Sequence, residues 1–255
     1  RALISVGYAT LGWDDGVPEA ACRLVSDLAS VSPVYTLPSS GVGHSRHYMP
    51  LAALDGAREK TSLVFDAFAR PGDGVLSVTW PVDLDPEARS LLGTLATNLG
   101  YLGRAESWVE AALLPSDSPA PPGTPCWPSA PGSQAPGRGW EQVNVLAPTT
   151  SEDYAIWREA EVSAILARPE LQPTGKGKLT PALKRKRDQA TAPYPLDLWS
   201  CLTASTSSLQ AAGWSRPPGS QRLLYWRRSD ALEVAPAAGR HSARTEHVEA
   251  LLLAI

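Results

Sequence analysis

Residues 61–80 read TSLVFDAFARPGDGVLSVTW. Two runs rich in β-branched and aromatic residues, 61–68 and 74–80, flank the turn sequence PGDG at 71–74. Runs of this composition, bounded by Pro and Gly, are typical of β-strands. The stretch therefore predicts two strands separated by a turn at 71–74.

Helical patterns lie on both sides of this strand pair. Residues 18–30 and 86–99 each begin at a proline and carry apolar residues at helical spacing. Residues 106–114 predict a further short strand or helix. The order helix, strand, strand, helix, strand matches a βαββαβ unit whose first strand we expect to precede Arg1. These patterns predict an α+β protein with a ferredoxin-like domain.

The second half of the chain alternates between irregular and regular segments. Residues 115–139 are rich in Pro, Gly and Ser and predict a long loop or insertion. Residues 169–193 are likewise expected to be irregular. Regular elements are expected at 140–147 (strand), 151–167 (helix), 196–212 (helix) and 221–227 (strand).

Composition and motif content exclude several classes of protein. The chain has 255 residues and a formal net charge of −3, so any RNA site must be a local basic patch. The sequence contains no P-loop, no GxGxxG in a βαβ context, no GxSxG and no HExxH. NTPase, dinucleotide-binding, α/β-hydrolase and zincin functions therefore have no support.

The three cysteines, Cys22, Cys126 and Cys201, are far apart in the sequence. They form neither a zinc motif nor an even-numbered disulfide framework, so no metal and no cofactor is predicted. A reduced, cytoplasmic setting fits this pattern. No apolar run approaches the ~20 residues that span a bilayer, so no membrane association is predicted.

The segment GHSRHYMP at 43–50 is the richest cluster of functional side chains. Arg46 can bind a phosphate, while His44, His47 or Tyr48 can stack on an unpaired base. In an extended backbone, His44 and Arg46 share one face and His47 lies on the other. The same side chains also permit two alternatives. Either histidine could transfer protons in catalysis, or the segment could be purely structural.

Two further segments carry candidate RNA-binding residues. In YLGRAESW at 101–108, Arg104 can reach a phosphate, although a simple turn explains the segment equally well. From Leu171 to Arg187 the chain holds six basic residues and no acidic residue. We expect this basic stretch to be a mobile arm that closes over a phosphate backbone; its basic residues are Lys176, Lys178, Lys184, Arg185, Lys186 and Arg187.

Four segments together resemble the type I-G (formerly I-U) CRISPR-associated fusion subunit of the Cascade complex. They are GHSRHYMP at 43–50, LVFDAF at 63–68, YLGRAESWVEA at 101–111 and GWSRPPGSQRLLYWRR at 213–228. That family joins a RAMP protein, which binds the 5′ handle of the crRNA, to a repeat-processing endoribonuclease of the Cas-six kind. The resemblance is ordered and extends from about Arg1 to about Arg228.

The resemblance implies a specific fold and specific partners. It implies RRM-like ferredoxin folds, with a RAMP-type handle-binding domain at 1–228 and the beginning of a second RAMP domain at 229–255. The implied role is in antiviral defence, at the foot of a Cascade complex. The implied partners are crRNA, the backbone subunits and the large subunit, with target DNA contacted indirectly.

The sequence also departs from the family pattern at both ends. Members begin with a strand and a Trp-Pro-Pro-rich segment, and they continue into a second RAMP domain that carries a Gly-His-x-His element. Both parts are expected to be missing here. We therefore expect this chain to bind RNA without cutting it. The alternative is a metal-independent endoribonuclease that processes CRISPR repeat RNA, with His44 or His47 as base or acid.

Overall fold

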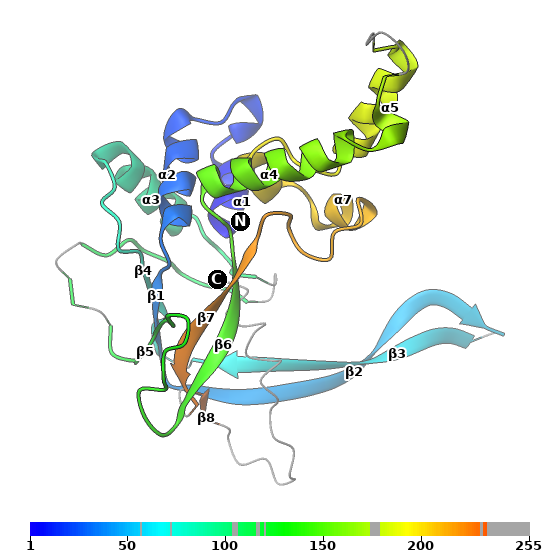
Figure 1. Cartoon of the computed structure of the whole chain (residues 1–255). Helices are drawn as coiled ribbons and strands as arrows, with labels where there is room; N and C mark the ends of the chain where they lie inside the picture. The colour runs from blue at the N-terminus through cyan, green and yellow to red at the C-terminus, as the bar shows by residue number, and fades with distance from the viewer. Residues whose placement is uncertain are drawn as a thin grey trace. The chain divides into compact units, whose positions relative to one another are not determined.

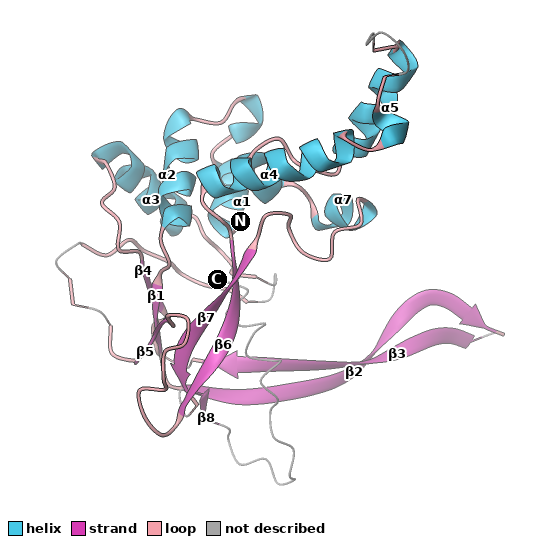
Figure 2. Ribbon diagram, in the orientation of Figure 1, coloured by secondary structure: helices cyan, strands magenta, loops and turns pink. Residues whose placement is uncertain are grey.

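The structure is a computed structural model that describes residues 1–56, 58–71, 73–103, 107–115, 118–119, 121–173, 179–229 and 232–233. Helices and largely antiparallel sheets occur together (Figure 2), which confirms the α+β class. The finer expectation of a ferredoxin-like fold is not confirmed.

The helices and strands follow one another in mixed order along the chain (Figure 1). The α-helices are α1 (Ala2–Thr10), α2 (Glu19–Ser30), α3 (Pro86–Thr97), α4 (Ser151–Leu166), α5 (Pro181–Thr191), α6 (Leu198–Thr203) and α7 (Thr206–Ala211), with short 3-10 helices at η1 (Trp13–Asp15) and η2 (Pro169–Leu171). The strands are β1 (Val34–Leu37), β2 (Ser40–Asp55), β3 (Arg58–Arg70), β4 (Ser77–Thr79), β5 (Thr124–Pro128), β6 (Trp140–Ala147), β7 (Gln221–Arg228) and β8 (Leu232–Glu233).

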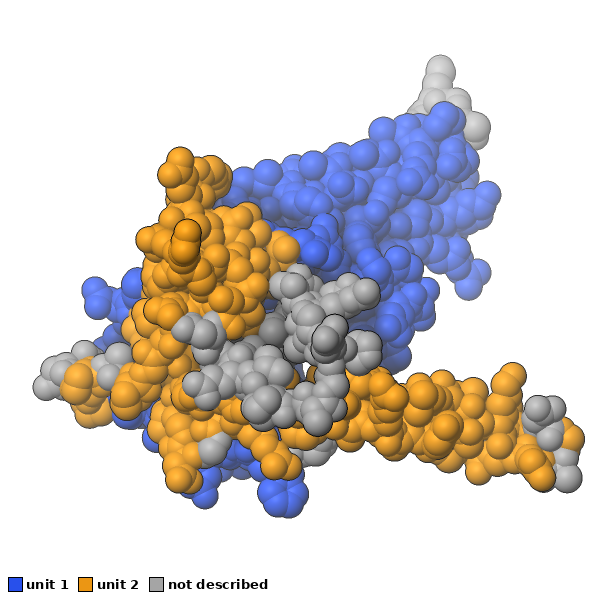
Figure 3. Space-filling view, turned by 90° about the horizontal axis from the view of Figure 1, so that it is seen from below, with its two compact units in different colours: residues 1–32, 81–114, 146–222 blue, residues 33–80, 115–145, 223–255 orange. Residues whose placement is uncertain are grey.

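The chain divides into two compact units, each assembled from three separate segments (Figure 3). Unit 1 comprises Arg1–Ser32, Pro81–Leu114 and Leu146–Arg222 and contains the helices. Unit 2 comprises Pro33–Trp80, Pro115–Val145 and Leu223–Ile255 and contains most of the strands. The expected second domain at 229–255 falls almost wholly outside the described residues, so it stays a prediction.

Unit 2 is built on a five-stranded sheet in the order β4-β1-β5-β7-β6. Strand β1 runs antiparallel to both β4 and β5, and β5 runs antiparallel to β7. One face of the sheet carries a buried cluster of Tyr35, Leu37, Cys126, Val143, Val145 and Tyr225. The phenol of Tyr225 donates a hydrogen bond of 3.0 Å to the carbonyl of Pro33, which satisfies its buried hydroxyl. The hairpin β2–β3 belongs to a separate three-stranded sheet of the same unit, in the order β3-β2-β8.

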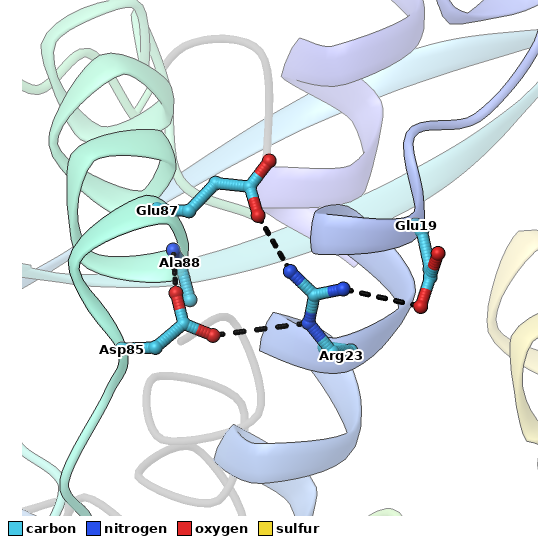
Figure 4. A network of polar contacts seen from close by, with 5 residues as sticks. All are labelled: Glu19, Arg23, Asp85, Glu87 and Ala88. Carbon is cyan, nitrogen blue, oxygen red and sulfur yellow. Dashed lines mark hydrogen bonds and ion pairs between the residues drawn. The ribbon is translucent and has the colours of Figure 1, made fainter.

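Unit 1 holds its first three helices together by a buried cluster around Trp13 and by an ion-pair network (Figure 4). Arg23 on α2 donates to Glu87 on α3 at 2.6 Å and to Glu19 on its own helix at 3.2 Å. Its Nε also lies 3.7 Å from Asp85, whose other oxygen caps α3 by accepting from the amide of Ala88. The network thus links the start of α3 to the side of α2.

The structure differs from the sequence predictions in the irregular segments. The predicted loop 115–139 contains β5, a central strand of the sheet, and the predicted irregular segment 169–193 contains η2 and α5. The predicted helix 196–212 is two short helices, α6 and α7. The described part of 106–114 forms no helix or strand, only an isolated bridge between Trp108 and Tyr101. Strand β5 forms by pairing with β1 and β7, which are distant in the sequence, so local composition does not record it.

Candidate nucleic-acid interface

The segment GHSRHYMP lies on a long two-stranded hairpin in unit 2. Strands β2 and β3 pair antiparallel from Gly41 opposite Arg70 to Pro50 opposite Thr61, and the register shifts beyond Pro50. Figure 1 shows the pair extending away from the five-stranded sheet. Residues 44–51 are all exposed to solvent. The hairpin therefore presents its candidate residues on an open surface.

The strand geometry separates the candidate residues into two faces. Because side chains alternate along a strand, His44, Arg46 and Tyr48 point to one face, while Ser45 and His47 point to the other. This confirms the arrangement expected for an extended backbone. One phosphate therefore cannot lie between the two imidazoles, so they cannot serve together as the acid and base of one cleavage step.

The first face carries a row of aromatic and cationic side chains. Phe65 on β3 lies directly opposite Arg46. The His44 ring stacks on the Phe65 ring, with centroids 5.0 Å apart and planes inclined by 24°. The Arg46 guanidinium carbon lies 5.7 Å from the centre of the same ring. Tyr48 follows next along the strand and is 71% exposed. We call His44, Arg46, Tyr48 and Phe65 the aromatic face.

The second face of the hairpin is organised around Asp66 and Phe68. His47 Nδ1 lies 3.7 Å from Asp66 Oδ2, which places a carboxylate beside the imidazole. The Phe68 ring covers Gly43, where an added Cβ atom would lie 2.7 Å from the ring. Arg70 in turn lies over Phe68, with its guanidinium carbon 5.4 Å from the ring centre. Phe68 thus fills the space above a glycine that has no side chain of its own.

The C-terminal half of the basic stretch forms a helix, which corrects the expectation of an irregular arm. Lys184, Arg185 and Lys186 are exposed on α5, whose residues are nowhere buried. Arg187 differs because its Nε donates a hydrogen bond of 2.8 Å to the carbonyl of Leu171. It therefore has a structural partner in η2. Lys176 and Lys178 lie outside the described residues.

Arg104 also lies outside the described residues, but the chain on each side of it is described. Tyr101 and Trp108 form an antiparallel bridge, and the amide of Leu102 donates to the carbonyl of Ser107 at 3.0 Å. Trp108 is 85% exposed, a feature that the sequence reasoning did not single out. An isolated tryptophan next to a predicted turn gives no sequence signal that separates an exposed ring from a buried one.

The segment at 213–222 makes close packing contacts within unit 1. The Trp214 indole donates to the carbonyl of Pro193 at 2.7 Å and packs near Trp157 and Tyr194. Gly219 has a φ of +68°, and a Cβ atom there would lie 2.5 Å from the Tyr154 ring. The glycine is thus required both for its backbone angle and for the approach of the ring.

A small pocket of about 260 Å³ in unit 1 lies among α2, α4 and the start of α6. Its one thiol belongs to Cys22, whose pKa is raised by partial burial and by the charges of Asp197 and Glu19. A raised pKa leaves less thiolate at neutral pH, so the Cys22 thiol is not activated as a nucleophile. Across the described ranges, no group of three or more His, Cys, Asp or Glu side chains is placed to hold a metal ion.

Comparison with known proteins gave no relative: none of the family models, curated proteins or solved structures that were searched matches the chain significantly. Within the described part of the chain, no helix combines the length and the apolar character needed to cross a membrane.

Proposed function

We propose that this chain is an RNA-binding subunit of a type I CRISPR Cascade complex, and that it binds the 5′ handle of the crRNA through the aromatic face of the hairpin. The observation that supports this most directly is the row formed by His44, Phe65, Arg46 and Tyr48 on an exposed strand pair. RNA-binding proteins use aromatic rings to stack on unpaired bases and arginine to bind phosphate.

The charge distribution supports a local site of this kind. The chain has a net charge of −3, so binding depends on particular basic side chains and not on the charge of the whole molecule. Arg46 supplies such a charge within the aromatic face. The exposed Lys184, Arg185 and Lys186 of α5 supply a second basic surface, in unit 1.

The sequence resemblance supports the more specific part of the proposal. The segments 43–50 and 63–68, which carry the resemblance, are the two strands that form the aromatic face. On this basis the RNA is crRNA, and the chain caps the filament of Cascade backbone subunits next to the large subunit, with target DNA contacted indirectly. The cytoplasm is the proposed location.

A second candidate function is metal-independent cleavage of CRISPR repeat RNA. The pairing of His47 Nδ1 with Asp66 at 3.7 Å favours it, because a carboxylate beside one ring nitrogen orients the imidazole, and the His47 side chain is 45% exposed. In this reaction the 2′-hydroxyl attacks the adjacent phosphate, His47 accepts the hydroxyl proton, and the 5′-oxygen leaves with a proton from water. The products are a 2′,3′-cyclic phosphate and a 5′-hydroxyl.

The experiment that tests both functions is one incubation of the chain with labelled CRISPR repeat RNA, with and without EDTA, across a series of salt concentrations. Arg46→Gln and Tyr48→Ala are compared with Met49→Ala, an exposed neighbour on the opposite face of the hairpin. We expect salt-sensitive binding without cleavage. Tyr48→Ala should weaken binding by about 1–3 kcal/mol, as expected for one lost base stack, and Met49→Ala should leave it unchanged.

The alternative outcomes separate the two functions. Cleavage that survives EDTA and disappears in His47→Ala would establish the endoribonuclease in place of simple binding. Binding that neither Arg46→Gln nor Tyr48→Ala weakens would remove the aromatic face as the RNA site.

A further inference from the structure

Phe65 is an unusual residue for its position in the hairpin. It belongs to none of the three buried clusters found among the described residues, and 44% of its surface is exposed. Its ring therefore does not serve a hydrophobic core. It instead contacts the two RNA-binding candidates on the neighbouring strand, His44 and Arg46.

We infer that Phe65 is a positioning residue, which holds the guanidinium of Arg46 and the imidazole of His44 in the places from which they contact RNA. This inference rests on the proposed function. Arginine has a long side chain that loses much rotamer freedom when it is fixed against a ligand. A ring beside it in the free protein restricts the guanidinium in advance, through a cation–π contact.

The geometry shows why Phe65 can position both residues at once. His44 and Arg46 are two residues apart on β2, and the side chain directly across from Arg46 is Phe65. Cross-strand neighbours and their diagonal partners lie close enough for aromatic and long side chains to touch. The His44 ring is nearly parallel to the Phe65 ring, so the position of the phenyl fixes the plane in which the imidazole lies.

The test measures RNA affinity and its salt dependence for Phe65→Leu, Phe65→Tyr, Arg46→Gln and the double variant Phe65→Leu/Arg46→Gln. The matched control is Phe68→Leu, the same substitution on the same strand but on the second face, where the ring also lies beside an arginine. The probe is a labelled CRISPR repeat RNA, and circular dichroism checks that each variant is folded.

Positioning predicts a particular pattern among these variants. Phe65→Leu should weaken binding about two- to five-fold, the size of an exposed cation–π contact, and Phe65→Tyr should restore it because the ring is retained. The loss in the double variant should be smaller than the sum of the two single losses, because Phe65 acts in part through Arg46 and in part through His44. Phe65→Leu should also make the salt slope shallower, by up to about 0.7 if one phosphate contact to a single strand is lost.

Other outcomes overturn the inference without overturning the proposed function. If Arg46→Gln weakens binding but Phe65→Leu does not, the aromatic face binds RNA and Phe65 does not position it. Fully additive losses with an unchanged salt slope would mean that Phe65 contacts a base directly. An equal loss in Phe68→Leu would assign the effect to general loosening of the hairpin. If Arg46→Gln and Tyr48→Ala are also without effect, the proposed function fails instead.

Discussion

At the scale of single residues, two glycines share a positive backbone angle but differ in how closely other atoms approach them. Gly213 and Gly219 both have positive φ, at +87° and +68°. Nothing lies within 4 Å of a Cβ atom added at Gly213, whereas at Gly219 that atom would lie 2.5 Å from the Tyr154 ring. Tyr154 is fully buried, so its ring has little room to move away.

We therefore predict that Gly219→Ala destabilises the protein more than Gly213→Ala. The second substitution should cost about 1–2 kcal/mol, the strain of a non-glycine residue in the left-handed region. The first should exceed that value because overpacking adds about 1–3 kcal/mol. Urea unfolding of the two variants measures the difference. Equal losses would show that the Tyr154 ring moves aside without cost.

At the scale of secondary-structure elements, α5 offers a surface whose charge can be reversed without disturbing the fold. No residue of α5 is buried, and Lys184 and Arg185 are exposed. Arg187 stays unchanged in such a design because its Nε bonds to Leu171. A carboxylate at position 184 lies in the first turn of α5 and interacts favourably with the helix dipole, but it also stands four residues before Asp188, so helicity has to be checked in the variant.

Lys184→Glu combined with Arg185→Glu should weaken binding of repeat RNA and make its salt slope shallower, because two cations are lost from a phosphate-binding surface. Filter binding over a salt series measures both quantities, and circular dichroism confirms that helicity is kept. If affinity and slope are both unchanged, α5 is not an RNA site.

Some elements could be predicted from the sequence because their signals are local. Helix α3 begins at a proline preceded by the capping residue Asp85, and a proline also precedes α2. The predicted starts of both helices therefore agree with the structure to within one residue. Strand β5 could not be predicted in this way. It contains Pro125 and Pro128 yet occupies a central place in the sheet, which is a position that proline normally disfavours.

The candidate site was predicted in part. The sequence predicted how residues 44–47 divide between two faces of an extended backbone, but it did not predict that they are exposed. The contribution of β3 was missed, because Phe65 reads as a core residue when its strand is considered alone. The sequence Asp55-Gly56 lies between residues 43–50 and 61–68 and is a hairpin signal. A two-residue turn there places Phe65 opposite Arg46, as the structure does. For α5, the pair Thr180-Pro181 is a signal for the start of a helix. The helix was nevertheless not predicted, because its charged sequence lacks the apolar stripe that indicates a helix.

At the scale of the whole molecule, buried thiols and phenols make stability depend on alkaline pH. Burial raises the pKa of the Cys126 thiol to about 12, from an ordinary value of 9.0, although the charge of Arg227 acts in the opposite direction. Burial also raises the pKa values of Cys201, Tyr35 and Tyr154. In each case the folded state keeps a proton that the unfolded chain releases first.

The free energy of unfolding should therefore be constant with respect to these groups below about pH 8 and fall as the pH rises above 9. Each buried thiol contributes up to about 1.4 kcal/mol per pH unit between its unfolded and folded pKa values. Urea unfolding at pH 7, 8.5 and 10 measures the decline, which should be less steep in Cys126→Ala. A midpoint that does not fall between pH 7 and 10 would contradict the prediction.

The place of β7 in the sheet has a consequence for how the protein is made. This strand lies between β5 and β6, yet it is the last of the five to be synthesised, 74 residues after the end of β6 (221 − 147). At about 5–20 residues per second, the ribosome takes roughly 4–15 s to cover that interval. During this time the nascent chain holds two strands whose shared neighbour does not yet exist. If translation stops before residue 221, the sheet lacks the strand that lies between β5 and β6. We expect chaperones and proteases to recognise such a product.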